Sequence, residues 1–235
     1  IARVEGTLSF LENRRGGFAS FCKKLEETRR PGSAAAIVMN ANPFTLGHQY
    51  LVERAAAEND TVHLFVLSEE GSLVPFAARW QMVTAGVAHL KNVVCHQTGP
   101  YLISAATFPS YFLRDEETVI RSHARLDLEL FLSIAQSLGV TARYAGEEPF
   151  SQVTGIYNQV MAQLLPERGI RFVEIPRRAE EGQTVSASAV RRAIRDGRME
   201  EMRAMVPQTT WDFFQSPQGQ AVAETIRRAG DVTHY

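Results

Sequence analysis

The architecture of the chain follows from one segment, Ala34-Ala-Ala-Ile-Val-Met-Asn-Ala-Asn-Pro-Phe-Thr-Leu-Gly-His48-Gln-Tyr-Leu-Val-Glu53. Residues 34–39 are small or apolar and predict a strand buried on both faces, as in sheets that helices cover on both sides. Asn-Ala-Asn-Pro ends this strand, and helical spacing begins at Gly47, so His48 lies in the first helical turn. Unpaired N–H groups and the positive end of the helix dipole meet there, which predicts an anion site suited to phosphate.

The same order of strand and helix repeats downstream. Runs rich in β-branched and aromatic residues predict strands at 61–67, 93–96, 141–144 and 171–175. Helical spacing predicts helices after Pro75, over 125–138, from about Thr154 and after Ser186, with two more at 199–206 and 221–229. No Asn-Gly or Asp-Gly turn joins two of these strands, so the sequence predicts parallel crossovers and an open α/β sheet.

Composition limits the classes of partner. Among 235 residues, 25 Lys and Arg nearly balance 26 Asp and Glu, and the net charge of -1 disfavours nucleic acid or an anionic membrane as the main partner. No apolar run has the length of a membrane span and no signal-peptide pattern opens the sequence, so a cytoplasmic location is expected. Cys22 and Cys95 lie far apart in unlike contexts, which indicates reduced thiols.

Three motifs together resemble the citrate lyase ligase family. They are Met39–His48, which ends in Thr45-Leu-Gly-His48, then Gly146-Glu-Glu-Pro-Phe150, and Val185-Ser-Ala-Ser-Ala-Val-Arg191. The first is similar to the signature of the HxGH nucleotidyltransferases, a Rossmann-like group that cleaves ATP between its α- and β-phosphates. The resemblance runs from about Ile37 to Pro207 and implies a Rossmann-like open parallel sheet with helices on both faces.

The resemblance also implies an activity. A member of this family would use Mg²⁺ and ATP to activate acetate as acetyl-adenylate with release of pyrophosphate. It would then acetylate the prosthetic thiol of the citrate lyase acyl carrier protein and release AMP. Acetate and that carrier protein are thus the expected partners, with no nucleic acid and no membrane. Two alternatives stay open: an adenylyltransferase for phosphopantetheine or nicotinamide mononucleotide, and an ATP-sensing module without catalysis.

The motifs supply the candidate site residues. His48 at a helix N-terminus can donate to an α-phosphate oxygen beside the Thr45 hydroxyl, and the Arg191 guanidinium can fork onto the β- and γ-phosphates. The alternative for Thr45 is a helix cap beside an incidental His48, and the serines before Arg191, taken alone, are most often a helix cap. A surface or salt-bridge role for Arg79 fits the sequence equally well. The expected catalytic residues are His48, Thr45 and Arg191, and the expected nucleotide-binding residues are Asn40, Asn42, Phe44, Arg79, Gly146, Glu148, Ser186 and Ser188.

Other polar residues receive plainer interpretations. His63 lies within an apolar strand and is expected to be a packed residue rather than a ligand. Cys95 and His96 are flanked by valines, which favours a strand over a nucleophile and its base. Arg192 and Arg195 are expected on a solvated helix face. The six histidines show no metal-ligand spacing, so Mg²⁺ held mainly by ATP is the expected ion, and Glu148 either binds it through water or orients its loop.

We expect three parts along the chain. The sequence begins at Ile1 without a methionine, and relatives of the ligase carry an acetyltransferase-like domain upstream, so residues 1–30 are interpreted as the tail of that truncated domain with a linker. Residues 31–207 form the nucleotidyltransferase domain, and residues 208–235 form a C-terminal helical extension. The family signature often has His at the position of Thr45 and Asp at the position of Asn42, and both substitutions keep a polar group.

Overall fold

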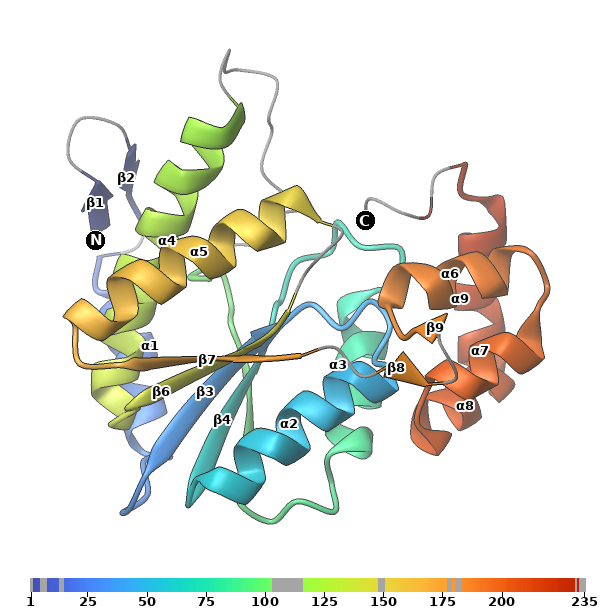
Figure 1. Ribbon diagram of the computed structural model, residues 1–235, viewed down its shortest axis with the longest axis horizontal. Helices are drawn as coiled ribbons and strands as arrows, with labels where there is room; N and C mark the ends of the chain where they lie inside the picture. The colour runs from blue at the N-terminus through green and yellow to red at the C-terminus, as the bar shows by residue number, and fades with distance from the viewer. Residues whose placement is uncertain are drawn as a thin grey trace.

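A five-stranded, fully parallel sheet forms the centre of the molecule (Figure 1). The computed structural model describes residues 2–4, 8–12, 15–102, 116–147, 151–176, 179–180, 183–230 and 232. The strand order is β5-β4-β3-β6-β7, which confirms the predicted Rossmann-like open sheet. The strands are β3 (Ala34–Met39), β4 (Thr61–Val66), β5 (Val93–Gln97), β6 (Ala142–Gly146) and β7 (Arg171–Ile175).

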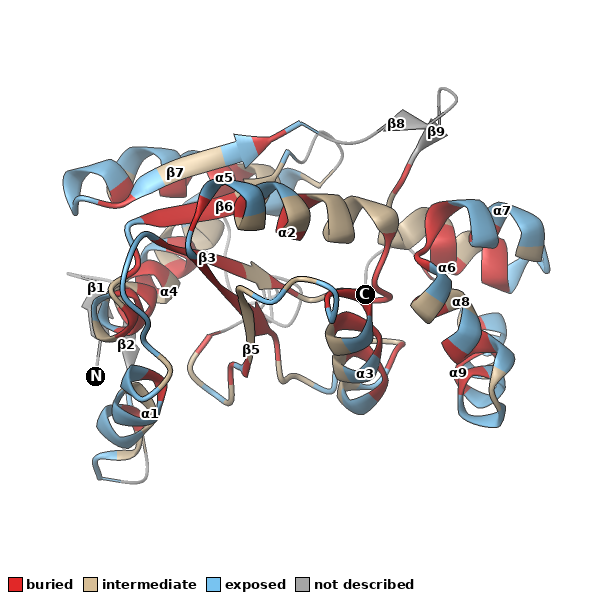
Figure 2. Ribbon diagram, turned by 90° about the horizontal axis from the view of Figure 1, so that it is seen from below, coloured by how far each residue is buried: buried red, intermediate tan, exposed pale blue. Residues whose placement is uncertain are grey.

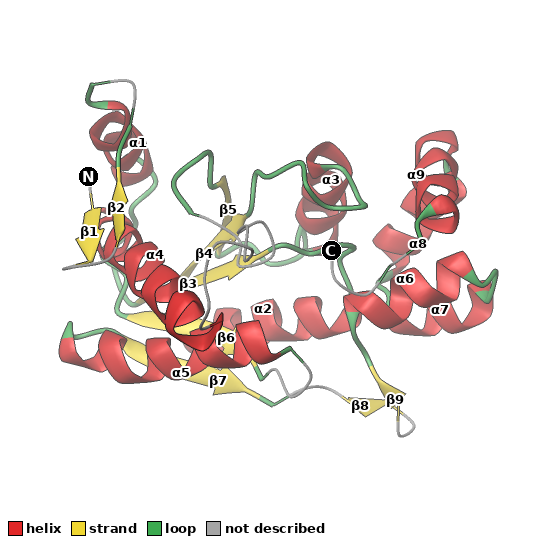
Figure 3. Cartoon of the chain, turned by 90° about the horizontal axis from the view of Figure 1, so that it is seen from above, coloured by secondary structure: helices red, strands yellow, loops and turns green. Residues whose placement is uncertain are grey.

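Helices cover both faces of this sheet, and a further group of helices lies at one end (Figure 3). One face packs against α2 (Leu46–Glu58) and α3 (Phe76–Gly86). The other packs against α1 (Gly17–Glu26), α4 (Glu116–Leu138) and α5 (Gln152–Glu167). The end group, coloured orange to red in Figure 1, contains α6 (Ala187–Arg195), α7 (Met199–Met205), α8 (Gln208–Gln215) and α9 (Pro217–Arg228).

The position of β3 between two hydrophobic cores explains why its sequence is apolar without interruption. Ala35 and Ile37 belong to the cluster on the side of α2 and α3, whereas Ala34 and Ala36 belong to the cluster on the side of α1, α4 and α5. Alternate residues therefore enter two different cores, and Figure 2 shows the central strands buried. Burying each large apolar side chain in such a core stabilises the fold by about 1.5–3 kcal/mol.

Several elements differ from the sequence-based expectation. Two short antiparallel hairpins were missed, β1 (Ala2–Val4) with β2 (Leu8–Phe10) and β8 (Ala179–Glu180) with β9 (Gln183–Thr184). Helix α4 begins at Glu116 rather than near residue 125. Helix α1, within the segment interpreted as a tail and linker, places Phe18 and Leu25 in the core beside α4 and α5. The three-part division of the chain stays a prediction.

Two buried histidines on neighbouring strands form a hydrogen-bonded pair. His63 Nδ1 and His96 Nε2 lie 2.9 Å apart, and the His96 ring stacks on Phe65 with centroids 4.8 Å apart. Burial lowers the pKa of each histidine to about 4, helped by the positive charge of Arg30 at His63 and by His63 itself at His96. His63 is thus a packed residue, as the sequence predicts.

Acid is expected to destabilise the protein between about pH 6.5 and pH 4 through this pair. The unfolded chain binds a proton on each histidine at about pH 6.5, whereas the folded chain does so only near pH 4. The contribution of the neutral pair to the free energy of unfolding is therefore fully present above this window and is lost as the pH falls through it. Each histidine contributes a slope of up to about 1.4 kcal/mol per pH unit. Urea unfolding at a series of pH values measures the slope, and His63→Leu with His96→Leu should flatten it. An equal slope in that double variant contradicts the prediction.

Candidate nucleotide-binding site

The N-terminus of α2 holds His48 in one orientation. Thr45 is the N-cap, and its Oγ1 accepts a hydrogen bond from the backbone N–H of His48 at 3.3 Å. In return, the backbone N–H of Thr45 donates to Nδ1 of His48 at 3.1 Å, which completes a capping box. Because a backbone N–H can only donate, Nδ1 is the acceptor, and the proton of the neutral ring lies on Nε2. The cap therefore sets His48 as an Nε2–H donor.

Phe44 supports this ring from the core. Its side chain is fully buried and stacks on His48, with centroids 5.8 Å apart and an interplanar angle of 15°. Across from it, a Cβ at Gly86 of α3 would collide with the Phe44 ring, so only glycine allows this approach. The contacts that the structure shows for Phe44 orient His48, and its direct contact with nucleotide stays a prediction.

The N-terminus of α6 lies beside that of α2. Ser186 caps α6 by accepting a hydrogen bond from the N–H of Ala189 at 3.1 Å, and its hydroxyl lies 3.1 Å from that of Ser188. A Cβ placed at Gly47 in the first turn of α2 would lie 3.6 Å from the carbonyl oxygen of Val185. The two motifs, distant in sequence, thus place two helix N-termini side by side, where backbone N–H groups of both helices favour an anion.

Arg191 joins the two motifs directly. Its side chain is 3% exposed, one Nη donates to the carbonyl of Asn42, and Nε donates to the carbonyl of Val232 at 2.7 Å. The first bond links residues 149 positions apart in the chain. The structure therefore brings Arg191 to the loop between β3 and α2 that carries Thr45 and His48.

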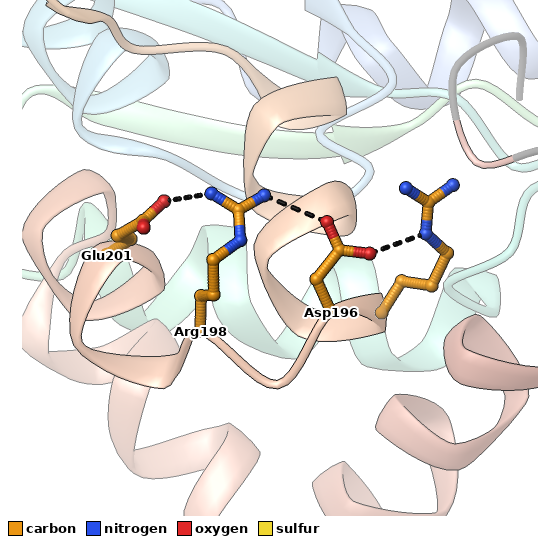
Figure 4. Close-up of polar contacts among 4 residues, drawn as sticks. Asp196, Arg198 and Glu201 are labelled. Atoms are coloured by element: carbon orange, nitrogen blue, oxygen red, sulfur yellow. Dashed lines mark hydrogen bonds and ion pairs between the residues drawn. The ribbon is translucent and has the colours of Figure 1, made fainter.

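The C-terminal end of α6 carries exposed ion pairs. Asp196 accepts from Arg195 at 2.8 Å and from Arg198 at 2.9 Å, and Arg198 also pairs with Glu201 at 2.5 Å (Figure 4). Arg195 is exposed, as the sequence predicts, and Arg192 is half-buried. Exposed ion pairs of this kind contribute little stability.

Arg79 is buried, and its guanidinium bonds the loops around the site. The side chain is 0% exposed, and burial lowers its pKa, an effect that Glu69 partly opposes. Its donors bond the backbone carbonyls of Val74 at 3.0 Å, Asn40 at 2.9 Å, Leu67 at 2.8 Å and Glu69. The surface role that the sequence left open is wrong. A contact of Arg79 with phosphate stays a prediction, whereas its bonds to the loops are what the structure shows.

Asn40 and Asn42 fix the turn after β3. The Asn42 side chain is buried, and its Oδ1 accepts from the N–H of Val74 at 3.1 Å. Asn40 bonds the Ser72 hydroxyl through Nδ2 at 3.0 Å. Both amides thus tie this turn to the segment before α3, and contact with nucleotide stays a prediction for both.

Of the motif at residues 146–150, the structure describes only the first two residues. Gly146 ends β6, and a Cβ there would meet no atom of the described residues within 4 Å. Glu148 lies outside the described residues. A residue that the sequence reasoning missed, Asn158 of α5, holds this strand end by donating to Gly146 O at 3.0 Å and to Glu174 Oε1 at 2.6 Å. An asparagine on the apolar face of α5 was the signal available, because buried amides require partners.

The described residues contain no group of three or more His, Cys, Asp and Glu side chains that could hold a metal ion. Among the described helices, none combines the length and apolar character needed to cross a membrane.

Replacing Thr45 by valine should loosen His48 and α2 together. The variant keeps the shape of the side chain but loses the cap, which costs about 1 kcal/mol of stability. It also removes the hydroxyl 2.9 Å from Nδ1, whereas the backbone N–H of residue 45 still donates to that atom, so the Nε2–H tautomer should persist while the ¹⁵N shift of Nδ1 changes and the ring becomes more mobile. Thermal unfolding and ¹⁵N chemical shifts of the His48 ring measure the two effects. Ser151 caps α5 in the same way away from His48, so Ser151→Ala is the matched control and should leave those shifts unchanged.

Comparison with known proteins places the chain in a family. The family model of the citrate lyase ligase C-terminal domain matches residues 34–214. The [citrate [pro-3S]-lyase] ligase of Klebsiella pneumoniae is 40% identical over 220 residues, which cover 91% of this chain and 64% of that protein. The ligase of Haemophilus influenzae is 39% identical over 212 residues, which cover 87% of this chain and 63% of that protein. The chain therefore spans about two thirds of the length of these relatives.

A solved structure agrees with the fold at lower sequence identity. Thermotoga maritima TmcAL bound with alpha-thio ATP superposes with a TM-score of 0.50 at 14% identity, covering 81% of this chain and 57% of that one. At this identity the likeness shows the fold alone, whereas the family model and the two ligases show the family. The chain belongs to the citrate lyase ligase family, through the C-terminal domain of that family.

Proposed function

We propose that this chain is the nucleotidyltransferase part of an AMP-forming acid–thiol ligase that acts on citrate lyase. In the first step, an acetate oxygen forms a bond to the α-phosphorus of Mg·ATP while the bond to the bridging oxygen of the β-phosphate breaks. The products are acetyl-adenylate and pyrophosphate. In the second step, the prosthetic thiol of the citrate lyase acyl carrier protein attacks the acetyl carbon, which forms the thioester and releases AMP.

The observation that carries the proposal is the paired helix N-termini with His48 set as a donor between them. During the first step the oxygens around the α-phosphorus become more anionic, so preorganised donors there lower the barrier. The capping box fixes the Nε2–H of His48 before substrate binds. His48 is therefore assigned to the α-phosphate, and Thr45 is assigned to holding its ring.

The N-terminus of α6 is assigned to the β- and γ-phosphates. Ser186 and Ser188 place two hydroxyls there, and Arg191 supplies positive charge from the buried side of the helix. A buried guanidinium acts through a lower effective dielectric than an exposed one, so its attraction for phosphate is stronger. The relatives named as ligases and the ATP analogue in TmcAL support a nucleotide as the occupant.

Isotope exchange between ATP and pyrophosphate tests the proposal. In the intact protein, labelled pyrophosphate should enter ATP only when acetate is present, because acetyl-adenylate formation is the reversible step. Exchange that needs phosphopantetheine or nicotinamide mononucleotide instead of acetate would show that the chain is an adenylyltransferase and would overturn the proposed function. ATP binding without exchange and without AMP formation, in the presence of acetate and the carrier protein, would make the chain a sensor.

A further inference from the structure

We propose that Val232 is a positioning residue whose backbone carbonyl holds Arg191 in the nucleotide site, an inference that rests on the proposed function. Val232, four residues beyond the end of α9, is 0% exposed and belongs to the core cluster that includes Val190 and Ile194 of α6. Its carbonyl accepts the Nε–H of Arg191 at 2.7 Å.

Two carbonyls from distant parts of the chain fix the same guanidinium. One belongs to Asn42 in the loop before α2, and the other belongs to Val232. An arginine side chain has several rotatable bonds, and fixing it before the ligand arrives lowers the entropy lost on binding. A carbonyl restrains the guanidinium through a hydrogen bond and adds no full negative charge beside it.

The apolar side chain of Val232 anchors this arrangement. A backbone carbonyl can position Arg191 only while its own residue stays in place, and the burial of the Val232 side chain supplies that hold. Releasing Val232 from the core removes the Nε acceptor and leaves the bond to Asn42 as the remaining one of the pair. Contacts with the β- and γ-phosphates exist in the ground state as well as in the transition state, so their loss affects KM for ATP more than kcat.

The test compares valines that differ in their link to Arg191. Val232→Asp expels residue 232 from the core, and Val232→Ala weakens its anchor there. Val222 of α9 belongs to the same core cluster, is 7% exposed and has no described bond to Arg191, so Val222→Ala removes the same atoms elsewhere. Val232→Asp should raise KM for ATP about ten-fold with kcat changed by less than about two-fold. Val222→Ala should lower thermal stability about as much as Val232→Ala and leave both kinetic constants unchanged.

A second arm tests the route through Arg191. In an Arg191→Lys background the Nε–H donor is absent, so Val232→Asp should add little to KM, and the two effects should be non-additive. Additive effects, or an unchanged KM in Val232→Asp, overturn the inference.

A third arm is independent of activity and separates the inference from the proposed function. The Nε–H of Arg191 should exchange slowly with solvent in the parent protein and at least ten-fold faster in Val232→Asp, as ¹⁵N NMR measures. Slow exchange in both proteins overturns the positioning role, whatever the activity. Slow exchange in the parent alone, in a protein that binds no ATP, supports the positioning role and overturns the proposed function.

Discussion

Replacing His48 by alanine is expected to lower the rate of acetate-dependent adenylate formation about 10²–10³-fold, as loss of one preorganised transition-state donor does elsewhere. The affinity for ATP should change much less, because the developing charge on the α-phosphate appears only as the bond breaks. Single-turnover kinetics with labelled ATP measure the step, and equilibrium dialysis measures the affinity.

A second histidine provides the control. His89 is exposed and lies 3.1 Å from Glu53 at the surface, so His89→Ala should keep the full rate. Folding of both variants is compared by circular dichroism, since His48→Ala also loses the acceptor for the Thr45 N–H. A properly folded His48→Ala variant with an undiminished rate would remove His48 from the catalytic set.

Replacing Arg79 by alanine is expected to destabilise the fold by about 3 kcal/mol or more, the range for breaking a buried polar network. The guanidinium holds four backbone carbonyls, and the loop after β3 and the segment before α3 would both lose their shared partner. Chemical denaturation followed by fluorescence measures the change. ATP affinity should fall as well, because Asn40 shares its turn with Asn42 and Thr45.

Two variants calibrate this result. Arg54 lies on the surface of α2 and pairs with Glu58 at 2.7 Å, so Arg54→Ala should change stability by less than about 0.5 kcal/mol. Arg79→Lys keeps a charge but not the planar array of donors, so it should recover only part of the loss. Full stability in Arg79→Ala would show that the loops hold their shape without the guanidinium.

Most of the fold could be predicted because its signals are local. The apolar run of β3, the proline before α3 and the glycine after α4 each report on their own segment, and the alternation of strands and helices gives the parallel sheet. The hairpins β1–β2 and β8–β9 were missed because strands of two or three residues have too few positions for a period to show. The packing of α1 was missed because its apolar face is defined by α4, which is distant in sequence.

The candidate site was predictable in its motifs and not in its supports. Thr45 and Ser186 could be identified as caps because cap residues precede helical spacing. The carbonyl partners of Arg79 and Arg191 could not be identified, because an arginine is expected at the protein surface when only the sequence is known. Its buried acceptors come from segments that are distant in the chain. Val232 carried no signal of its own, because any apolar residue can fill its place in the core.

The 149-residue separation between Arg191 and Asn42 has a consequence for biosynthesis. A ribosome releases the chain from its first residue onward, and domains gain their long-range contacts only when both partners have emerged. The loop between β3 and α2 therefore leaves the exit tunnel long before α6 does, and a nascent chain without α6 lacks the bond between Arg191 and Asn42. Nascent chains that stop short of α6 should retain no ATP through this site, and nucleotide capture should begin only after α6 has emerged.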